Sequence, residues 1–468
     1  MDRLSALDAN FLYGETPETP MHVAGLAICE APAPGVKPFE AFRDHIKERL
    51  HLLPFFHRKL SLSPIQLDHP VWVEEDEPDF EYHIRNIALP KPGSDEQLRT
   101  LVSRLHMILL DRGRPLWQYY VIEGLKDGRF ALYLKMHHAT IDGGAGAAAI
   151  ETILGYEKQP APVAPPPPKK KVPPPNIFEL ISDSYANFFN QQREFIRQWP
   201  DIGEAIANVG KRLTQDLSNP QPLLIAPKTI FNTKLSNQRS FGTCTLSLKD
   251  VKAAGKAVNA KVNDVVMTIC AGALRRYLKG RDSLPSESLI AAIPVSLRKP
   301  GNVEMNNQVT AMLCKLATDI ADPVERIKAI VESANDAKER LGDVREVIPT
   351  DLSFIGAPII MSGMARMLGE GNIAEQMPAL MNVLISNVPG PREQMYCVGA
   401  KVEEYYPVSI PSHGGILNMT VVSYMDRMEF GLIACRETLP DIDVLTKYLV
   451  DEFAALQKAV HGRRQRAA

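Results

Sequence analysis

The chain has 468 residues, of which 45% are hydrophobic and 23% charged, and its formal net charge at pH 7 is -2. This length is sufficient for two or three domains with sizeable apolar cores. The small net charge provides no general attraction to nucleic acid or to anionic membranes, so any such attraction must come from local patches. We find no secretory signal, no CxxC pair and no apolar run of the roughly 20 residues that span a membrane. The composition therefore favours a cytoplasmic globular protein with reduced cysteines.

In the first third of the chain, the apolar pattern predicts amphipathic helices over 39–50 and 95–110 and a short strand over 71–73. Apolar residues alternate over 130–136, which predicts a strand that ends at a pair of histidines. A run of small residues over 144–150 then predicts the start of a helix. The histidines thus stand where a strand gives way to a loop, and a side chain at such a place can reach a cleft while the sheet holds its backbone.

The histidine pair opens the segment HHATIDG, in which His137 and His138 are followed by Asp142 and Gly143. Histidine has the unperturbed pKa nearest to neutrality, so a partner carboxylate can tune it into a general base. A buried polar cluster without chemistry is the alternative interpretation. A metal site is disfavoured because vicinal histidines on a strand point in different directions and no third ligand stands at a recognisable spacing.

The clearest boundary is the segment 160–175, in which nine of sixteen residues are proline. Proline lacks the amide donor and fixes φ, so this segment predicts an extended spacer. A ligand for proline-binding modules is the alternative. We therefore expect an N-terminal domain over 1–159, a linker over 160–175 and a C-terminal domain over 176–468.

Beyond the linker, 176–217 is rich in large apolar residues at mixed spacings of three and four, which predicts an amphipathic helical region. The apolar residues are Ile177, Phe178, Leu180, Ile181, Tyr185, Phe188, Phe189, Phe195, Ile196 and Trp199. Two interpretations remain open: the apolar face packs on the body of the protein, or it touches a lipid surface with Lys169–Lys171 alongside.

The remainder of the chain mixes strands and helices, as the first third does, with no internal repeat visible. The segment 405–425 contains prolines and glycines and is interpreted as a loop that feeds strands. A hairpin is expected from the strands over 417–424 and 428–434. The other expected elements are strands over 241–248 and 289–293 and helices over 249–260, 262–278 and 323–338. The fold class is therefore α/β, a sandwich of two similar domains.

The segment HHxxxDG, followed by a helix of small residues, resembles the active-site motif of the coenzyme A-dependent acyltransferase superfamily, which includes chloramphenicol acetyltransferase and peptide-synthetase condensation domains. Further blocks in the same order look like the bacterial wax ester synthase/diacylglycerol acyltransferase family. These blocks are Leu4–Leu12 with Pro20–Val23, Pro115–Trp117, Val262–Val266, Pro294–Arg298 and Ser386–Pro391. They run from residue 4 to residue 391, so the resemblance covers most of the chain.

The resemblance implies two chloramphenicol acetyltransferase-like domains that meet at a channel, which acyl-CoA enters at one end and the acyl acceptor at the other. It implies O-acyl transfer to a long-chain alcohol, a diacylglycerol or both, with acyl-CoA as a substrate and no cofactor. The expected partners are these substrates and a peripheral lipid surface at the inner membrane and lipid droplets. We expect no nucleic-acid partner, and the sequence does not indicate an oligomeric state.

The resemblance also implies roles for individual residues. His138 is expected to be the general base, with His137 orienting the loop or assisting, and Asn263 is expected to donate to the oxyanion. Asp142 is expected to brace the loop, with Arg298 as its proposed partner. The expected substrate-binding or channel residues are Gly143, Pro115, Leu116, Trp117, Ser386 and Asn387.

Three other interpretations compete with this one. His137 and Asp142 also satisfy HxxxxD, the signature of glycerolipid acyltransferases, but the accompanying Glu-Gly-Thr-Arg block is absent. A condensation-type enzyme would use a carrier-bound donor, and the chain has no carrier module. A non-enzymatic lipid-body-binding protein would need the apolar helix but not His138.

Overall fold

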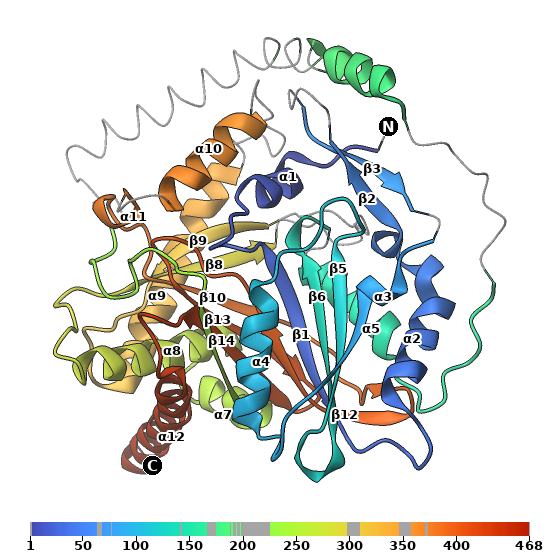
Figure 1. The fold of residues 1–468 in the computed structure, drawn as a ribbon. Helices are drawn as coiled ribbons and strands as arrows, with labels where there is room; N and C mark the ends of the chain where they lie inside the picture. The colour runs from blue at the N-terminus through green and yellow to red at the C-terminus, as the bar shows by residue number, and fades with distance from the viewer. Residues whose placement is uncertain are drawn as a thin grey trace.

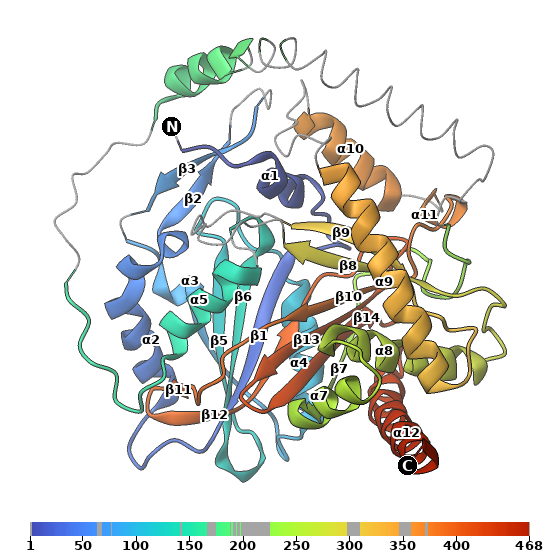
Figure 2. The same cartoon turned by 180° about the vertical axis from the view of Figure 1, so that it is seen from behind.

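The computed structural model describes residues 2–62, 68–75, 77–140, 143–165, 175–187, 189–190, 193, 197, 225–296, 309–345, 357–369 and 373–467. Two six-stranded sheets form its frame, and helices cover both of them (Figures 1 and 2). A separate two-stranded sheet pairs β2 (Arg58–Ser61) with β3 (Val71–Glu74). The fold is therefore a mixed α/β arrangement built around two sheets, as the sequence predicts.

The first sheet has the strand order β11-β12-β1-β6-β5-β4. Its central strand β6 pairs antiparallel with β1 and with β5, and β5 pairs parallel with the edge strand β4. The strands are β1 (His22–Cys29), β4 (Ile84–Ala88), β5 (Trp117–Glu123), β6 (Phe130–His137), β11 (Tyr396–Cys397) and β12 (Ala400–Val408).

Both faces of the first sheet are buried, so alternate residues of β6 enter different cores. Phe130, Leu132, Leu134 and Met136 pack with α2 (Pro38–Arg49) and α5 (Gly143–Leu154). Ala131 and Tyr133 pack on the other face with α4 (Asp95–Met107), which also reaches β7 of the second sheet. The views from the two sides show α4 on one face and α5 on the other (Figures 1 and 2).

The second sheet has the strand order β7-β14-β13-β10-β8-β9. Its strands β13 and β14 form a tight antiparallel hairpin, and β10 runs parallel to β13 and β8. The strands are β7 (Arg239–Ser247), β8 (Ile290–Ser296), β9 (Val309–Lys315), β10 (Val383–Val388), β13 (Leu417–Tyr424) and β14 (Arg427–Cys435).

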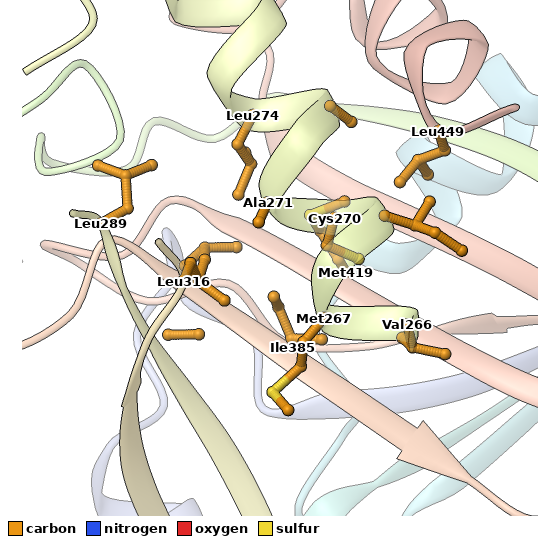
Figure 3. Close-up of a cluster of buried hydrophobic side chains, with 14 of the residues drawn as sticks. Val266, Met267, Cys270, Ala271, Leu274, Leu289, Leu316, Ile385, Met419 and Leu449 are labelled. Atoms are coloured by element: carbon orange, nitrogen blue, oxygen red, sulfur yellow. The ribbon is translucent and has the colours of Figure 1, made fainter. Parts of the chain in front are cut away.

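Helix α8 (Val262–Lys279) is the centre of the second core. Thirteen of its 18 residues are buried, because the helix lies between the sheet and the neighbouring helices α9 and α12. Figure 3 shows Met267, Cys270 and Leu274 of α8 among side chains from the strands and from α12. Further helices are α1 (Ala6–Tyr13), α3 (Phe80–His83), α7 (Leu248–Ala257), α9 (Pro323–Arg345), α10 (Ala357–Gly369), α11 (Ile373–Gln376) and α12 (Ile442–Ala467). Short 3-10 turns occupy Leu50–Leu52, Pro54–Phe56, Lys126–Gly128 and His138–Thr140.

The two sheets meet where β12 lies beside β14. At Gly431 of β14, a Cβ atom would stand 1.8 Å from the carbonyl oxygen of Pro407, so only glycine allows this approach. A polar cluster lies at the same junction: Thr245 donates to Oε2 of the fully buried Glu429, and Nε of Arg427 lies 3.1 Å from Oε1. Burial raises the pKa of Glu429 to about 7, and the charge of Glu404 adds to the effect.

The strand expected over 130–136, the hairpin and the helix expected over 262–278 are confirmed with small shifts of their ends. The helix expected over 95–110 ends at Met107 instead. The expected loop over 405–425 is wrong at its start, because residues 405–408 belong to β12. Residues 160–165 of the proline-rich segment have no regular secondary structure, and 166–174 lie outside the described residues. The predicted domain bounds stay a prediction, and β11 and β12, although they follow the linker, lie in the first sheet.

Candidate active site

The two histidines of HHATIDG stand at the end of β6, where two neighbouring segments hold their backbone. The amide of His137 donates to the carbonyl oxygen of Leu116 at 2.9 Å, and the amide of His138 donates to that of Met21 at 2.8 Å. His137 lies opposite His22 in the antiparallel register of β1 and β6. Below the turn, Leu12, Leu116 and Ala139 pack in one buried cluster. The sheet therefore fixes the point at which both imidazoles leave the backbone.

The imidazole of His137 is fully buried, and each of its nitrogens faces a group of the protein. Its Nδ1 accepts a hydrogen bond from the amide of Ala139 at 3.0 Å. Its other nitrogen, Nε2, is 3.2 Å from Oε2 of Glu15. This arrangement suits a residue that orients the turn, because neither nitrogen is available to a substrate.

Glu15 was not identified from the sequence, and it is the acidic centre of the site. It follows α1 and its side chain is only 4% exposed. Its Oε1 accepts from Nη2 of Arg112 at 2.8 Å, while Oε2 lies 3.4 Å from Nε2 of His22. Burial alone raises the pKa of a carboxyl, but here the contacts with His137 and His22 outweigh it and hold the pKa of Glu15 well below its usual range. Glu15 is therefore an ionised carboxylate inside the protein.

A buried polar network continues from Glu15 toward α4. Nε2 of His106 lies 3.1 Å from the carbonyl oxygen of Ser409 and therefore donates to it, so Nδ1 of the neutral ring accepts from the hydroxyl of Tyr133 at 2.7 Å. Nζ of Lys135 donates to the carbonyl groups of Leu105, in the last turn of α4, and of Ile108, just after it, at 3.0 and 2.7 Å. Burial lowers the pKa of Lys135 to about 7 and the pKa of His22 to about 4. This network holds the C-terminal end of α4 against β6, the strand that carries His137.

The imidazole of His138 differs from that of His137 because it is only half-buried. It stacks on the phenyl ring of Phe11, with 4.0 Å between the ring centroids and 11° between the planes. Phe11 lies on α1, whose first turn is capped by Ser5, and α1 packs against the turn that begins at His138. Stacking on a ring held by a capped helix restricts the rotation of the imidazole. His138 is thus a positioned histidine that remains partly accessible.

The residues of the predicted block Pro115–Trp117 lie beneath the histidines. Leu116 and Trp117 are completely buried. Nε1 of Trp117 donates to the carbonyl oxygen of Phe56 at 3.1 Å, and the ring of His83 stacks on the indole at 4.1 Å. These contacts make the block a support for β5 and β6, and its role in shaping a channel stays a prediction.

In the second half of the chain, Asn263 is half-buried in the first turn of α8. The adjacent Asp264 accepts from the amide of Lys261 at 2.8 Å and caps the helix, while Asn263 forms no hydrogen bond among the described residues. Ser386 and Asn387, near the end of β10, are also half-buried. Val262, next to Asn263, and Asn387 line one cleft of about 310 Å³. The structure therefore brings Asn387 and the start of α8 together.

Two of the predicted site residues, Asp142 and Arg298, lie outside the described residues. Gly143 is the first residue of α5. Among the described residues, no group of three histidine, cysteine or carboxylate side chains has the arrangement of a metal site.

The sequence model of the wax ester synthase/diacylglycerol acyltransferase catalytic domain matches residues 4–266. The model of the C-terminal domain of the same enzymes matches residues 305–457. This chain belongs to the wax ester synthase/diacylglycerol acyltransferase family. It is therefore an acyltransferase, and acyl-CoA and an acyl acceptor are its substrates.

Relatives match this acyltransferase along nearly its whole length. The O-acyltransferase WSD of Acinetobacter baylyi is 33% identical, over 98% of each chain. The solved structure of the wax ester synthase/diacylglycerol acyltransferase from Marinobacter aquaeolei VT8 is 32% identical and aligns with a TM-score of 0.68, over 98% of this chain and 100% of that one. The first condensation domain of the calcium-dependent antibiotic synthetase, at 12% identity, aligns with a TM-score of 0.58 over 98% of this chain and 96% of that one, which shows a shared fold alone. The expected fold and family are confirmed.

Proposed function

We propose that this acyltransferase moves a long-chain acyl group from acyl-CoA to the hydroxyl of a fatty alcohol, a diacylglycerol or both, with His138 as the general base. The observation that carries the proposal is the different placement of the two histidines. His137 has one nitrogen bonded to Ala139 and the other facing Glu15, whereas His138 is partly accessible and its ring is held by Phe11. A base must reach the proton that it removes, and His138 alone of the pair meets this condition.

In this mechanism the imidazole of His138 accepts the proton of the acceptor hydroxyl as its oxygen attacks the thioester carbonyl. The new carbon–oxygen bond forms, the negative charge develops on the carbonyl oxygen, and the carbon–sulfur bond then breaks. The imidazolium returns its proton to the departing thiolate, so the products are the ester and free CoA. No acyl-enzyme forms, and one base serves both steps.

The developing oxyanion requires hydrogen-bond donors. We assign this role to the side-chain amide of Asn263, which has no hydrogen-bond partner among the described residues to compete for its N–H groups. Ser386 and Asn387 are weaker candidates for the same role. Preorganised donors at a developing oxyanion usually contribute the largest share of rate in acyl transfer. Asp142, with Arg298 as its partner, is proposed to brace the loop after His138, and Gly143 to admit substrate beside it.

The proposed acceptors are insoluble in water, so we also propose peripheral contact with lipid surfaces, the inner membrane and lipid droplets. None of the described helices is long and apolar enough to cross a bilayer. The helical residues 177–187 support a surface contact, because polar side chains attach them to the protein: Arg3 pairs with Asp183, and Nδ2 of Asn187 donates to Asp68 at 2.7 Å. Ile177, Phe178 and Tyr185 point outward instead, and Phe178 is 79% exposed. Such a face suits a lipid interface better than a core. Phe188 and Phe195, in the same apolar run, lie outside the described residues.

The experiment that tests the reaction supplies palmitoyl-CoA with hexadecanol, with dipalmitoylglycerol, or with neither, and measures thiol release and the ester product. We expect thiol release that depends on an acceptor, with matching amounts of ester. Hydrolysis without ester would contradict acyl transfer. Absence of turnover with every acyl-CoA but turnover with a carrier-bound acyl thioester would favour the condensation-type alternative, and absence with both would favour a non-enzymatic lipid-binding protein.

A further inference from the structure

A cleft of about 310 Å³ opens in the second half of the chain, outside the histidine site. Its walls come from the first turns of α7 and α8, from the residues after β10, and from the turn between β13 and β14. Lys252 and Arg392 stand at this cleft together with Asn387 and Ser423. Gly390, in the wall, donates its amide to Ser423 at 3.1 Å, which holds the segment after β10 against the hairpin.

The charged residues that line the cleft are all positive. Lys252 and Arg392 are the charged residues among those that line it, and no carboxylate is present there. Both side chains are exposed, and neither forms an ion pair or a hydrogen bond among the described residues. Many other cations of this protein are paired; Arg427, from the same hairpin turn, lies 3.1 Å from Glu429. Two unpaired cations on one concave surface favour an anion with several charges.

The position of the cleft connects it to the proposed chemistry. Asn387 lines it directly, and Val262 in its wall precedes Asn263. Met425, also in the wall, packs against the buried cluster of the first sheet, which includes Ala149 and Ile153 of α5. The cleft therefore adjoins the proposed oxyanion donors on the side of the second sheet.

We infer that this cleft binds the phosphate groups of the nucleotide end of acyl-CoA, through the side chains of Lys252 and Arg392. The inference rests on the proposed function, because among the substrates proposed there only the CoA thioester carries phosphates. The acyl chain and both acceptors are uncharged. The 3′-phosphate and the diphosphate of CoA are separate anionic groups, so two separate cations at one cleft match them better than they match a single charge.

The test compares donors with and without the nucleotide. In the variant Lys252→Ala/Arg392→Ala, we expect the KM for palmitoyl-CoA to rise about 10-fold or more with little change in kcat, because charged contacts remote from the reacting bond contribute uniform binding. With palmitoyl-pantetheine, which lacks the nucleotide, the double variant should match its control. The control is Lys256→Ala, which removes an exposed lysine one turn along α7 that does not line the cleft. The variant Lys252→Arg/Arg392→Lys keeps both charges and should retain most of the affinity for palmitoyl-CoA.

Adenosine 3′,5′-bisphosphate provides a second measurement, which does not depend on turnover. Calorimetry should detect its binding to the wild-type protein and to Lys256→Ala, and weaker binding or none to the double alanine variant. Equal affinity in all three proteins, or a KM that rises equally for both donors, would overturn the inference. Anionic headgroups are the other source of phosphate: loss of sedimentation with phosphatidylglycerol vesicles at an unchanged KM would assign the cleft to lipid and also overturn it. If the wild-type protein binds the bisphosphate but transfers no acyl group from any donor, the proposed function fails while the cleft remains a nucleotide site.

Discussion

The imidazole of His138 stacks on the phenyl ring of Phe11 with only 11° between the two planes. An aromatic contact of this kind contributes about 0.5–1.5 kcal/mol beyond the area that it buries. If that energy serves to hold the base in one orientation, Phe11→Ala should lower kcat by up to about 10-fold and leave KM for the acceptor nearly unchanged. Phe11→Leu, which fills the space without a ring, is the matched variant. Equal rates for wild type and Phe11→Ala in a steady-state assay would show that the stack does not position the base.

Replacement of the proposed base itself has a larger expected effect. His138→Ala should reduce turnover by roughly 10²–10⁴-fold, the usual contribution of a positioned general base. The ring is only half-buried, so the melting temperature should change little. His137→Gln is the comparison: it disturbs the contact with Glu15 and should lower stability together with rate. Wild-type thiol release by folded His138→Ala would contradict the mechanism.

Neutralising Glu15 should weaken the fold around the histidines. Glu15→Gln leaves Arg112 without its carboxylate and His137 facing an amide, and we expect a loss of about 2 kcal/mol or more in the free energy of unfolding. The pKa of Glu15 is depressed in the folded protein, so its stabilising contribution is fully present above the ordinary pKa of a glutamate, about 4.3. The contribution is lost as pH falls below that value. Urea titrations from pH 7 to pH 3 should therefore show that the free energies of unfolding of the wild type and the variant converge at acid pH. A constant difference between the two free energies across this range would contradict the assignment.

The buried Glu429 at the junction of the sheets predicts the opposite dependence on pH. Its folded pKa is raised to about 7 by burial, so the folded protein loses stability as pH rises from the ordinary glutamate value through about 7. Glu429→Gln removes this loss while keeping an acceptor for Thr245. We expect the variant to gain stability relative to the wild type between pH 5 and pH 8, by roughly 3 kcal/mol at most. Melting temperatures across that range measure the difference, and a constant difference would show that Glu429 does not titrate there.

The outward-facing side chains of 177–187 give a test of lipid contact. Ile177→Ser/Phe178→Ser/Tyr185→Ser should reduce co-sedimentation with lipid droplets or vesicles, because these residues are between 48% and 79% exposed and their loss removes apolar contact area. Transfer to a water-soluble alcohol should be unaffected. Val450→Ser, an exposed apolar site on α12, is the control. A folded triple variant that sediments like the wild type would place the lipid contact elsewhere.

The local sequence pattern was sufficient to predict much of the fold around the site. The alternation that predicts a strand up to the histidines, and the small residues that predict a helix after them, correspond to β6 and α5. Both signals are local, since they depend on side chains two to four positions apart. The motif likewise identified His137 and His138 because the pair and its spacing lie within seven residues.

Glu15 could not be found in that way. It is more than a hundred residues from His137 in sequence, and it reaches the imidazole only because β1 pairs with β6 and places its N-terminal end, with the preceding loop, beside the histidines. Antiparallel pairing between distant strands leaves no local signal in a single sequence. The helical residues 177–187 illustrate a different limit: their periodicity indicates an apolar face but not which face packs, and here polar side chains contact Arg3 and Asp68.

The pairing of β12 with β1 also constrains how the chain can acquire its fold during synthesis. Six residue pairs, from Ala24 with Val408 to Cys29 with Val402, join a strand made at the start of translation to one made near its end. Until residue 408 leaves the ribosome, one edge of the first sheet has no partner, although β6 already covers the other edge of β1. An open strand edge is a template for pairing with other chains. That edge of the nascent first half therefore needs protection while the rest of the chain is made. The first sheet is completed only when β12 has been synthesised.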